Sequence, residues 1–235
     1  MNTNYIENNS VRLNYLENET KQDMQKTSIL FIPGMLGHAE HYQAEIEKLN
    51  DRYCLALSLR GRGKSDSPKT GYSYEDHLSD IESCCNQILK SPFIIVAHSV
   101  GVPYALGYAL KNPNNLKGLI LIDYPAVYIP LSEKWVENLL EQPGINKQLI
   151  LGLKNESRFI LLWDKLDKIQ YPVLVIRGGK EGALLPKDDS KLYEEKLEHI
   201  KVATLANSGH EPSKEDFNEF LNLIKNFAAK TEASS

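Results

Sequence analysis

The sequence predicts an α/β protein in which a mostly parallel sheet carries helices on both faces. Short apolar runs rich in β-branched residues alternate along the chain with longer segments of helical periodicity. The clearest run, residues 93–97, is too short for a typical helix and favours a strand buried on both faces. A turn of small residues and an apolar helical segment follow it directly, which makes a strand–turn–helix unit.

The other elements follow the same alternation in chain order. Strands are predicted at residues 4–7, 11–17, 28–32, 53–59, 93–97, 116–122, 173–176 and 202–205. Helices are predicted at residues 39–49, 74–89, 103–110, 188–197 and 214–227. The first two strands can add an antiparallel pair at one edge of the sheet.

Turn and capping residues mark several of these boundaries. Asn8-Asn9-Ser10 has the composition of a turn, so the first two strands are expected to form a hairpin. Pro33-Gly34 ends the strand at 28–32, and Ser73 is a helix N-cap residue. Pro172 suits the entry to the strand at 173–176, where a missing ladder N–H costs least.

The regular alternation stops between residues 124 and 171. Apolar residues recur there at helical spacing, as in the pairs Trp135/Leu139 and Phe159/Trp163. We expect a single domain over residues 1–235, into which 124–171 is inserted as a short helical segment. Most of its apolar residues should pack against the domain, while a minority of aromatic residues should face a pocket.

Composition and charge exclude several classes of function. The 235 residues are 42% hydrophobic and 25% charged, which suits one globular α/β domain. The net charge of −4 provides no basic field for nucleic acid or acidic lipid. No apolar run approaches the length of a bilayer span, and residues 1–10 are too polar for a signal peptide.

The three cysteines indicate neither a disulfide framework nor a zinc site. Cys54, Cys84 and Cys85 are odd in number and include an adjacent pair. A reducing cytoplasm is therefore the expected location. The sequence contains no metal or nucleotide motif, so we expect no cofactor and a small molecule as substrate. It gives no indication of an oligomeric state.

Ser99 lies in the turn that follows the strand at 93–97. Ala97 and Gly101, two residues before and after it, are small, as a strained strand-to-helix turn requires. The pattern is G-x-S-x-G with alanine in the first position. On these residues the chain resembles the α/β-hydrolase family, from about residue 4 to residue 227. The resemblance implies the α/β-hydrolase fold, Ser99 as nucleophile, and a short helical cap formed by residues 124–171.

A serine nucleophile needs a general base, and the base needs an acid that orients it. The family's chain order is serine, acid, histidine. Among the six histidines, only His210 follows the last predicted strand, where Gly209 lets the loop turn back before the final helix. We therefore predict His210 as the base. His98 adjoins the serine in sequence and should pack beneath the site.

Two carboxylates compete for the role of the acid. The family usually supplies it from the loop after the strand at 173–176, where the matching position holds Glu181 in place of aspartate. Some relatives take it from the end of the preceding strand, where this chain has Asp123. Asp123 could equally be a strand-end residue that binds backbone amides. We favour Glu181 and keep Asp123 as the alternative.

The resemblance also implies an oxyanion hole, since the tetrahedral intermediate needs two backbone N–H donors. One is expected from Val100, which follows the serine. The other is expected from Met35, which follows Gly34 in the loop after the strand at 28–32. Four further residues are predicted to line the substrate pocket: His38, Tyr124, Tyr128 and Trp135.

The segment Arg60-Gly61-Arg62-Gly63-Lys64-Ser65 could be mistaken for a phosphate-binding loop. It lacks the spacing of a P-loop and does not directly precede a helix. It resembles instead the structural Arg-Gly-x-Gly-x-Ser loop of the same family, with Ser58 where aspartate is usual.

The resemblance implies a serine hydrolase that cleaves a carboxylic ester, lactone or thioester through an acyl-enzyme. Two alternatives use the same fold. One is a lyase or a carbon–carbon bond hydrolase with the same triad. The other is a ligand-binding signalling protein that turns over slowly or not at all.

Overall fold

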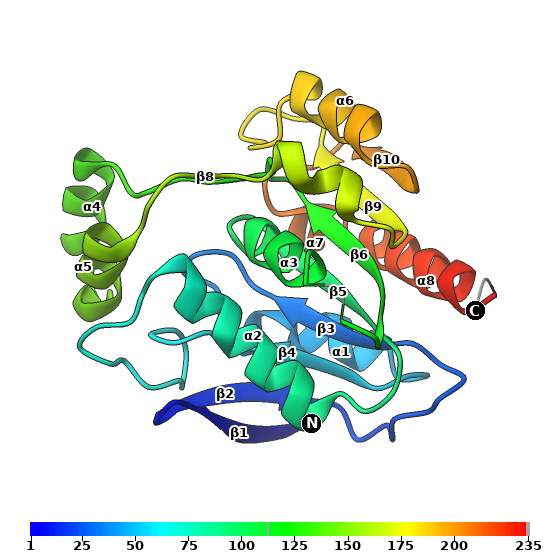
Figure 1. The fold of residues 1–235 in the computed structure, drawn as a ribbon, viewed down its shortest axis with the longest axis horizontal. Helices are drawn as coiled ribbons and strands as arrows, with labels where there is room; N and C mark the ends of the chain where they lie inside the picture. Colours follow the sequence, from blue (N-terminus) through cyan, green and yellow to red (C-terminus); the bar gives the residue numbers. More distant parts are fainter. Residues whose placement is uncertain (112, 234–235) are drawn as a thin grey trace.

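One eight-stranded sheet organises the computed structural model, which describes residues 1–111 and 113–233 (Figure 1). The strand order is β1-β2-β4-β3-β5-β6-β9-β10. The strands are β1 (Asn2–Asn8), β2 (Val11–Glu17), β3 (Ser28–Ile32), β4 (Cys54–Leu57), β5 (Phe93–His98), β6 (Leu116–Ile122), β9 (Val173–Gly178) and β10 (Ile200–Leu205). The hairpin β1–β2 is antiparallel and β2 joins β4 in antiparallel pairing, while all other neighbours are parallel. The predicted fold class is therefore confirmed.

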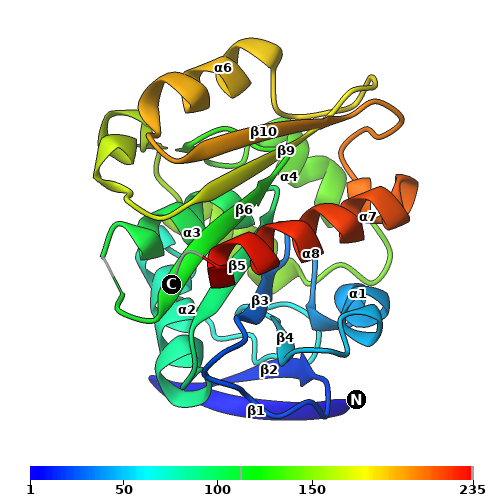
Figure 2. The same cartoon turned by 90° about the vertical axis from the view of Figure 1, so that its right-hand side faces the viewer.

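Helices cover both faces of the sheet, and successive residues of β5 contact opposite layers. Ile94 and Val96 belong to the core under η1 (Ala39–Tyr42), α1 (Gln43–Lys48) and α8 (Phe217–Ala233). Ile95 and Ala97 belong to the core under α2 (Tyr74–Ile88), α3 (Gly101–Ala109) and α6 (Lys187–Lys196). Figure 2 shows α1 and α8 on one side of the sheet and α2 and α3 on the other. A strand buried on both faces explains the unbroken apolar run.

Local sequence signals set the helix boundaries. The Ser73 hydroxyl accepts the N–H of Asp76, whose carboxylate accepts the Ser73 N–H, so α2 begins with the predicted N-cap as a full capping box. The helix predicted at 214–227 is divided into α7 (Pro212–Glu215) and α8, because Asp216 between them has φ −136° and ψ 48°, outside the helical region.

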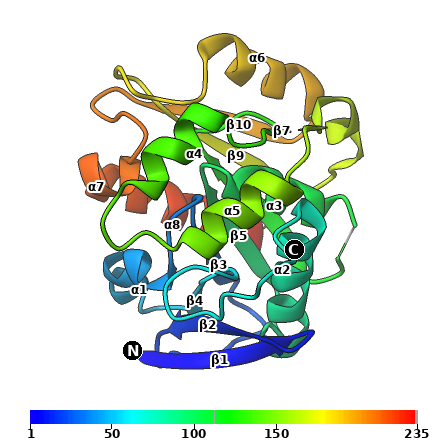
Figure 3. The same cartoon turned by 90° about the vertical axis from the view of Figure 1, so that its left-hand side faces the viewer.

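The segment 124–171 projects from the end of the sheet. It contains β7 (Val127–Tyr128), α4 (Glu133–Leu140), α5 (Lys147–Glu156), β8 (Ile160–Leu161) and η2 (Trp163–Lys168). Figure 1 shows α4 and α5 set apart at the left, joined to the rest by the β7–β8 ribbon, and Figure 3 looks onto them from outside. A small core of their own holds α4 and α5 together around Tyr72.

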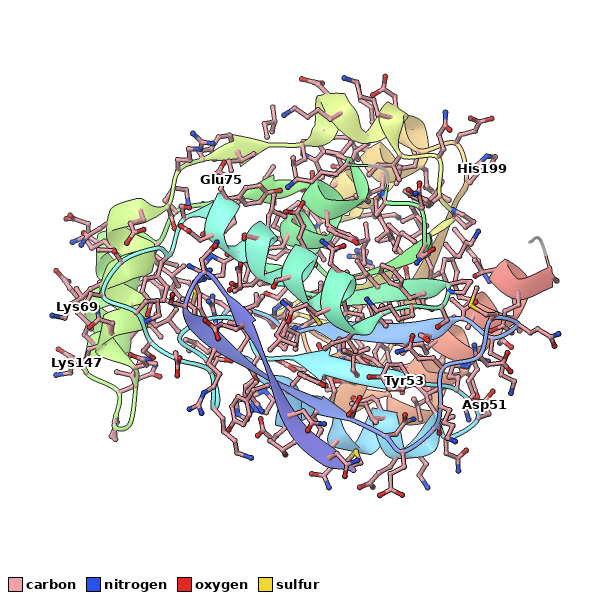
Figure 4. The ribbon with its side chains drawn as sticks, turned by 60° about the horizontal axis from the view of Figure 1, so that its bottom comes forward. Asp51, Tyr53, Lys69, Glu75, Lys147 and His199 are labelled. Carbon is pink, nitrogen blue, oxygen red and sulfur yellow. The ribbon has the colours of Figure 1, made fainter. Side chains whose placement is uncertain are left out.

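Helix α5 is attached to the loop that follows β4. Asn146 Nδ2 donates to Gly61 O at 2.9 Å, and Gln148 Nε2 donates to Lys69 O at 2.9 Å. Glu156 accepts the N–H of Tyr72 at 2.8 Å. Figure 4 accordingly shows Lys69 of this loop and Lys147 of α5 at the same edge of the molecule. Among the helices of residues 1–111 and 113–233, none combines the length and hydrophobicity needed to cross a membrane.

Candidate active site

Ser99 sits on a strained turn between β5 and α3. Its φ of 54° lies in the left-handed region, and its N–H donates to Ile122 O at 3.0 Å. A Cβ at Gly101 would lie 2.8 Å from Ile32 O, so a larger residue does not fit there. A Cβ at Gly34 would lie 3.0 Å from Ser99 Cβ. These close approaches explain why small residues surround the serine in sequence and in space.

His210 connects Ser99 to Asp123. Its Nε2 lies 3.0 Å from Ser99 Oγ, and its Nδ1 lies 2.9 Å from Asp123 Oδ2. The loop that carries His210 follows β10 and passes against the end of β9. A Cβ at Gly178 would lie 2.1 Å from Gly209 O, so glycine at 178 is what allows this approach.

Asp123 is fully buried at the end of β6, with a φ of 47°. Its carboxylate accepts three backbone N–H groups, from Leu184 at 2.7 Å, Gly178 at 3.1 Å and Leu185 at 3.3 Å. Burial by itself would raise the pKa of Asp123. The hydrogen bonds from His210, Leu184 and Gly178 outweigh burial and lower the pKa, so the carboxylate is ionised.

The preference for Glu181 as the residue beside His210 is revised by this geometry. Glu181 is exposed, and within residues 1–111 and 113–233 no hydrogen bond or ion pair joins its side chain to His210. The loop between β9 and α6 turns its backbone N–H groups toward Asp123 and its Glu181 side chain toward solvent. Asp123 therefore occupies the position that sequence reasoning had assigned first to Glu181.

Two backbone N–H groups adjoin Ser99. Val100 directly precedes the first turn of α3, and Met35 lies on the wall of the cavity over Ser99. Across the described part of the chain, neither N–H donates to a protein acceptor. The N-terminus of a helix favours negative charge. This arrangement suits a negatively charged oxygen atom beside Ser99.

A cavity of about 320 Å³ opens over Ser99. Its lining residues are Pro33, Gly34, Met35, Leu36, Gly37, His41, Tyr42, His98, Ser99, Trp135, Leu184, His210, Glu211, Ser213 and Lys214. Trp135, predicted to line the pocket, lies on this wall and is 46% exposed. Apolar side chains on one part of the wall and His41, Glu211, Ser213 and Lys214 on another give the cavity mixed polarity.

Three residues predicted for the pocket lie elsewhere. Tyr128 is buried, with its hydroxyl 2.9 Å from Ser157 Oγ. Tyr124 packs against the same core. His38 turns its Nδ1 to Glu40 at 2.8 Å, and its ring adjoins that of His41, with centroids 3.9 Å apart and ring planes tilted by 41°. His41, which lies in η1, lines the cavity instead, and the sequence analysis did not predict it.

His98 links the turn at Ser99 to the loop that carries His210. Its Nε2 lies 2.7 Å from His210 O, and the two rings have centroids 4.6 Å apart. Because a carbonyl oxygen only accepts, Nε2 carries the proton. Burial, together with the neighbouring His210, lowers the pKa of His98 and favours its neutral form.

A larger groove of about 730 Å³ lies on another face, between α2, α3 and the segment 158–168, near Glu75 in Figure 4. None of the described residues that line it is serine, cysteine or histidine. Elsewhere in the described chain, no cluster of three or more His, Cys, Asp or Glu side chains could hold a metal ion.

Comparison with known proteins identifies the family. Residues 27–155 match the model of the alpha/beta hydrolase fold, and the chain belongs to this family. An esterase from Exiguobacterium antarcticum shares the fold, with a TM-score of 0.77 at 18% identity over 96% of this chain and 98% of that one. The α/β-hydrolase fold predicted from the turn around Ser99 is thus confirmed, and the protein is an enzyme of this fold.

Two relatives are named hydrolases of small molecules. A 2-(acetamidomethylene)succinate hydrolase of Mesorhizobium japonicum is 30% identical over 97 residues, which cover 41% of this chain and 35% of the relative. The chain thus spans about a third of that relative's length. An N-formylmaleamate deformylase of Pseudomonas putida is 22% identical over 255 residues, which cover 93% of each chain.

Proposed function

We propose that this enzyme is a serine hydrolase that cleaves a carboxylic ester, lactone or thioester through an acyl-enzyme. One observation carries the proposal. A continuous hydrogen-bonded path runs from Ser99 Oγ through His210 to Asp123, with distances of 3.0 and 2.9 Å. The three residues lie in the order that serine hydrolysis requires, with Ser99 as nucleophile, His210 as base and Asp123 as the acid that orients the base.

In the first step, Ser99 Oγ attacks the carbonyl carbon of the substrate and His210 Nε2 takes the hydroxyl proton. Asp123 accepts a hydrogen bond from His210 Nδ1–H, which holds the ring in the tautomer that leaves Nε2 free to accept. The ionised carboxylate also stabilises the imidazolium that forms. In this proposal Asp123, and not Glu181, is the acid.

The negative charge that develops on the carbonyl oxygen is stabilised by the N–H groups of Met35 and Val100. His210 then passes its proton to the leaving oxygen or sulfur as the carbon–heteroatom bond breaks. A water molecule, deprotonated by His210, attacks the acyl-enzyme. Collapse of the second intermediate returns the proton to Ser99 and releases the carboxylic acid.

The substrate is proposed to be a small molecule with a short or medium acyl group. The cavity volume of about 320 Å³ supports this, since it lies at the small end of ligand pockets. Residues 124–171 act as a short cap on a single domain, and Trp135 of the cap forms one wall. The three free cysteines are buried and support a cytoplasmic location.

Hydrolysis of an acyl C–N bond is a second candidate. It is favoured by the names of the two relatives, one a hydrolase of an acetamido compound and the other a deformylase of an N-formyl compound. The same three side chains serve either bond, because both reactions form a tetrahedral oxyanion and then the same kind of acyl-enzyme, while the proton from His210 goes to a leaving nitrogen instead of oxygen or sulfur.

The test is turnover of matched p-nitrophenyl esters, thioesters and N-acyl amides by the wild type and by Ser99→Ala, together with labelling by a fluorophosphonate. Ser99→Ala should abolish labelling and lower kcat by about 10⁴- to 10⁶-fold. Undiminished labelling would identify another nucleophile. Wild-type labelling without turnover of any substrate would favour a signalling protein, and products other than the acid and its alcohol, thiol or amine would favour lyase or carbon–carbon chemistry.

A further inference from the structure

Arg62 is a buried cation without a carboxylate partner. It is 3% exposed, and among the ion pairs of the described residues none includes it. Arg60, two residues earlier, differs sharply. Its Nε and Nη2 bind the two oxygens of Asp80 at 2.8 and 2.6 Å, and the pair is buried. Burying an unpaired charge is costly, so the lone guanidinium calls for an explanation.

The Arg62 guanidinium binds only neutral acceptors on three different elements. Nε–H donates to Met35 O at 2.8 Å, and Nη1–H donates to Arg60 O at 2.8 Å. Nη1 also contacts His77 Nε2, which must then accept. His77 Nδ1–H in turn donates to Ser73 O at 2.7 Å, so His77 is neutral. Burial and the charge of Arg62 keep the pKa of His77 well below its ordinary value.

Backbone geometry brings the Arg62 loop against the loop that carries Met35. Gly63 has a φ of 53°, and a Cβ there would lie 2.8 Å from His38 Cβ. On the other side, a Cβ at Gly61 would lie 3.2 Å from Leu149 Cβ of α5. The loop with Arg62 therefore lies between the loop that carries Met35 and helix α5. From this position the Arg62 side chain reaches the Met35 carbonyl.

We propose that Arg62 is a positioning residue of the oxyanion hole. Its guanidinium holds the Met35 carbonyl, which restrains the backbone on both sides of the Met35 Cα and so keeps the Met35 N–H toward the substrate. Its unneutralised charge adds positive potential where the oxyanion forms. The proposal rests on the proposed serine hydrolase function. The segment Arg60-Gly61-Arg62-Gly63-Lys64-Ser65 is interpreted from sequence as a structural loop, which gives no reason for a second arginine. The proposal gives that arginine, Arg62, a role.

The charge and the hydrogen bond both act on the transition state more than on the bound substrate. The substrate carbonyl is neutral, whereas the tetrahedral intermediate carries a full negative charge beside Met35 N–H. Loss of Arg62 should therefore lower kcat and leave KM nearly unchanged. It should also weaken an inhibitor that forms a charged adduct with Ser99.

The experiment compares Arg62→Met, which removes the charge and the donor, with Arg62→Lys, which keeps the charge but loses the planar fork. Tyr104→Phe is the matched control, because it removes a hydroxyl from the same buried region (Tyr104 O–H donates to Tyr128 at 3.3 Å) without touching Met35. For each variant we would measure kcat and KM on p-nitrophenyl butyrate and the Ki of an alkyl trifluoromethyl ketone. The total amplitude of fluorophosphonate labelling measures how many enzyme molecules have a correctly folded active site, and kcat is divided by this amount.

Arg62→Met should lower kcat per labelled site by about 10- to 100-fold, with KM changed by less than about threefold. The Ki should rise by a factor close to the loss in kcat/KM. Arg62→Lys should fall between Arg62→Met and the wild type, and Tyr104→Phe should match the wild type per labelled site.

The proposal is overturned if Arg62→Met keeps wild-type kcat and Ki per labelled site and loses only labelling amplitude or thermal stability. If Arg62→Met does not fold, Arg62→Lys decides. A fall in kcat of at least about fivefold together with a rise in Ki of at least about fivefold supports the proposal, and wild-type values of both refute it. A wild-type protein that lacks Ser99-dependent turnover would refute the proposed function, and this inference with it.

Discussion

His98 Nε2–H donates to the carbonyl oxygen of His210 at 2.7 Å. The residue before Ser99 therefore holds the loop that carries His210. This bond joins the end of β5 to the loop after β10, two segments more than a hundred residues apart in sequence.

Replacement of His98 should separate this positioning from packing. His98→Phe retains the ring but leaves the His210 carbonyl without its donor, and kcat should fall by about tenfold, as expected for the loss of a buried hydrogen bond of 1–3 kcal/mol. His98→Gln can still donate to the carbonyl and should recover most of the rate. Steady-state kinetics and thermal unfolding of both variants check this. Wild-type kcat in His98→Phe would contradict it.

The two carboxylates considered for the acid should behave differently. Asp123→Asn should lower kcat by about 10⁴-fold, because an amide can hold the imidazole in the wrong tautomer and cannot stabilise the imidazolium. Glu181→Gln should stay near wild type, since Glu181 is exposed and, among the described residues, no hydrogen bond or ion pair joins its side chain to His210. Kinetics of both single variants decide, and a reversed pattern would return the role to Glu181.

The buried side chain of Glu45 should make the free energy of unfolding depend on pH. It is 3% exposed on α1, and its Oε2 has no hydrogen-bond partner among the described residues. Burial raises the pKa of Glu45, and Ser213 and Lys214 only partly oppose this. The folded state therefore binds the proton more tightly than the unfolded state, so ionised Glu45 destabilises the fold at neutral pH. This cost disappears as the pH falls through the raised pKa toward the unfolded value of about 4.3.

Glu45→Gln should accordingly be more stable than the wild type at pH 7 to 8, by an amount on the order of 1 kcal/mol. The difference should vanish near pH 4. Urea unfolding across this pH range measures it. Glu47→Gln, on the same helix but exposed, is the control and should leave the stability nearly unchanged. Equal stability of wild type and Glu45→Gln at pH 8 would refute the assignment.

The cavity over Ser99 should select short or medium acyl chains. Its volume of about 320 Å³ and its wall of Trp135 and Met35 leave little room for a long chain. Values of kcat/KM for p-nitrophenyl esters from acetate to palmitate should peak at or below about eight carbons. Trp135→Ala should move the optimum to longer chains. A sharp optimum at palmitate in the wild type would contradict this prediction, because it would require a larger acyl-binding space than this cavity provides.

Much of the fold, together with two of the three residues on the path from Ser99 through His210 to Asp123, could be predicted from the sequence. The unbroken apolar run at β5 indicates a strand buried on both faces. The small residues near Ser99 indicate a tight turn in which larger side chains would not fit. The Ser73 capping box sets the start of α2 through residues 73–76 alone. His210 was predictable because the order of elements leaves one histidine after the last strand.

The carboxylate beside His210 and the lining of the cavity depended on contacts between segments distant in sequence. Asp123 and Glu181 lie on neighbouring strand ends, and sequence cannot tell which side chain turns inward. The tertiary structure decides this through the left-handed backbone of Asp123 and three N–H groups from the loop after β9, which stabilise the buried carboxylate and leave Glu181 in solvent. Likewise, Tyr128 packs in the core and His41 lines the cavity because the packing of η1 and of the segment 124–171 against the sheet, rather than residue type, determines which side chain faces Ser99.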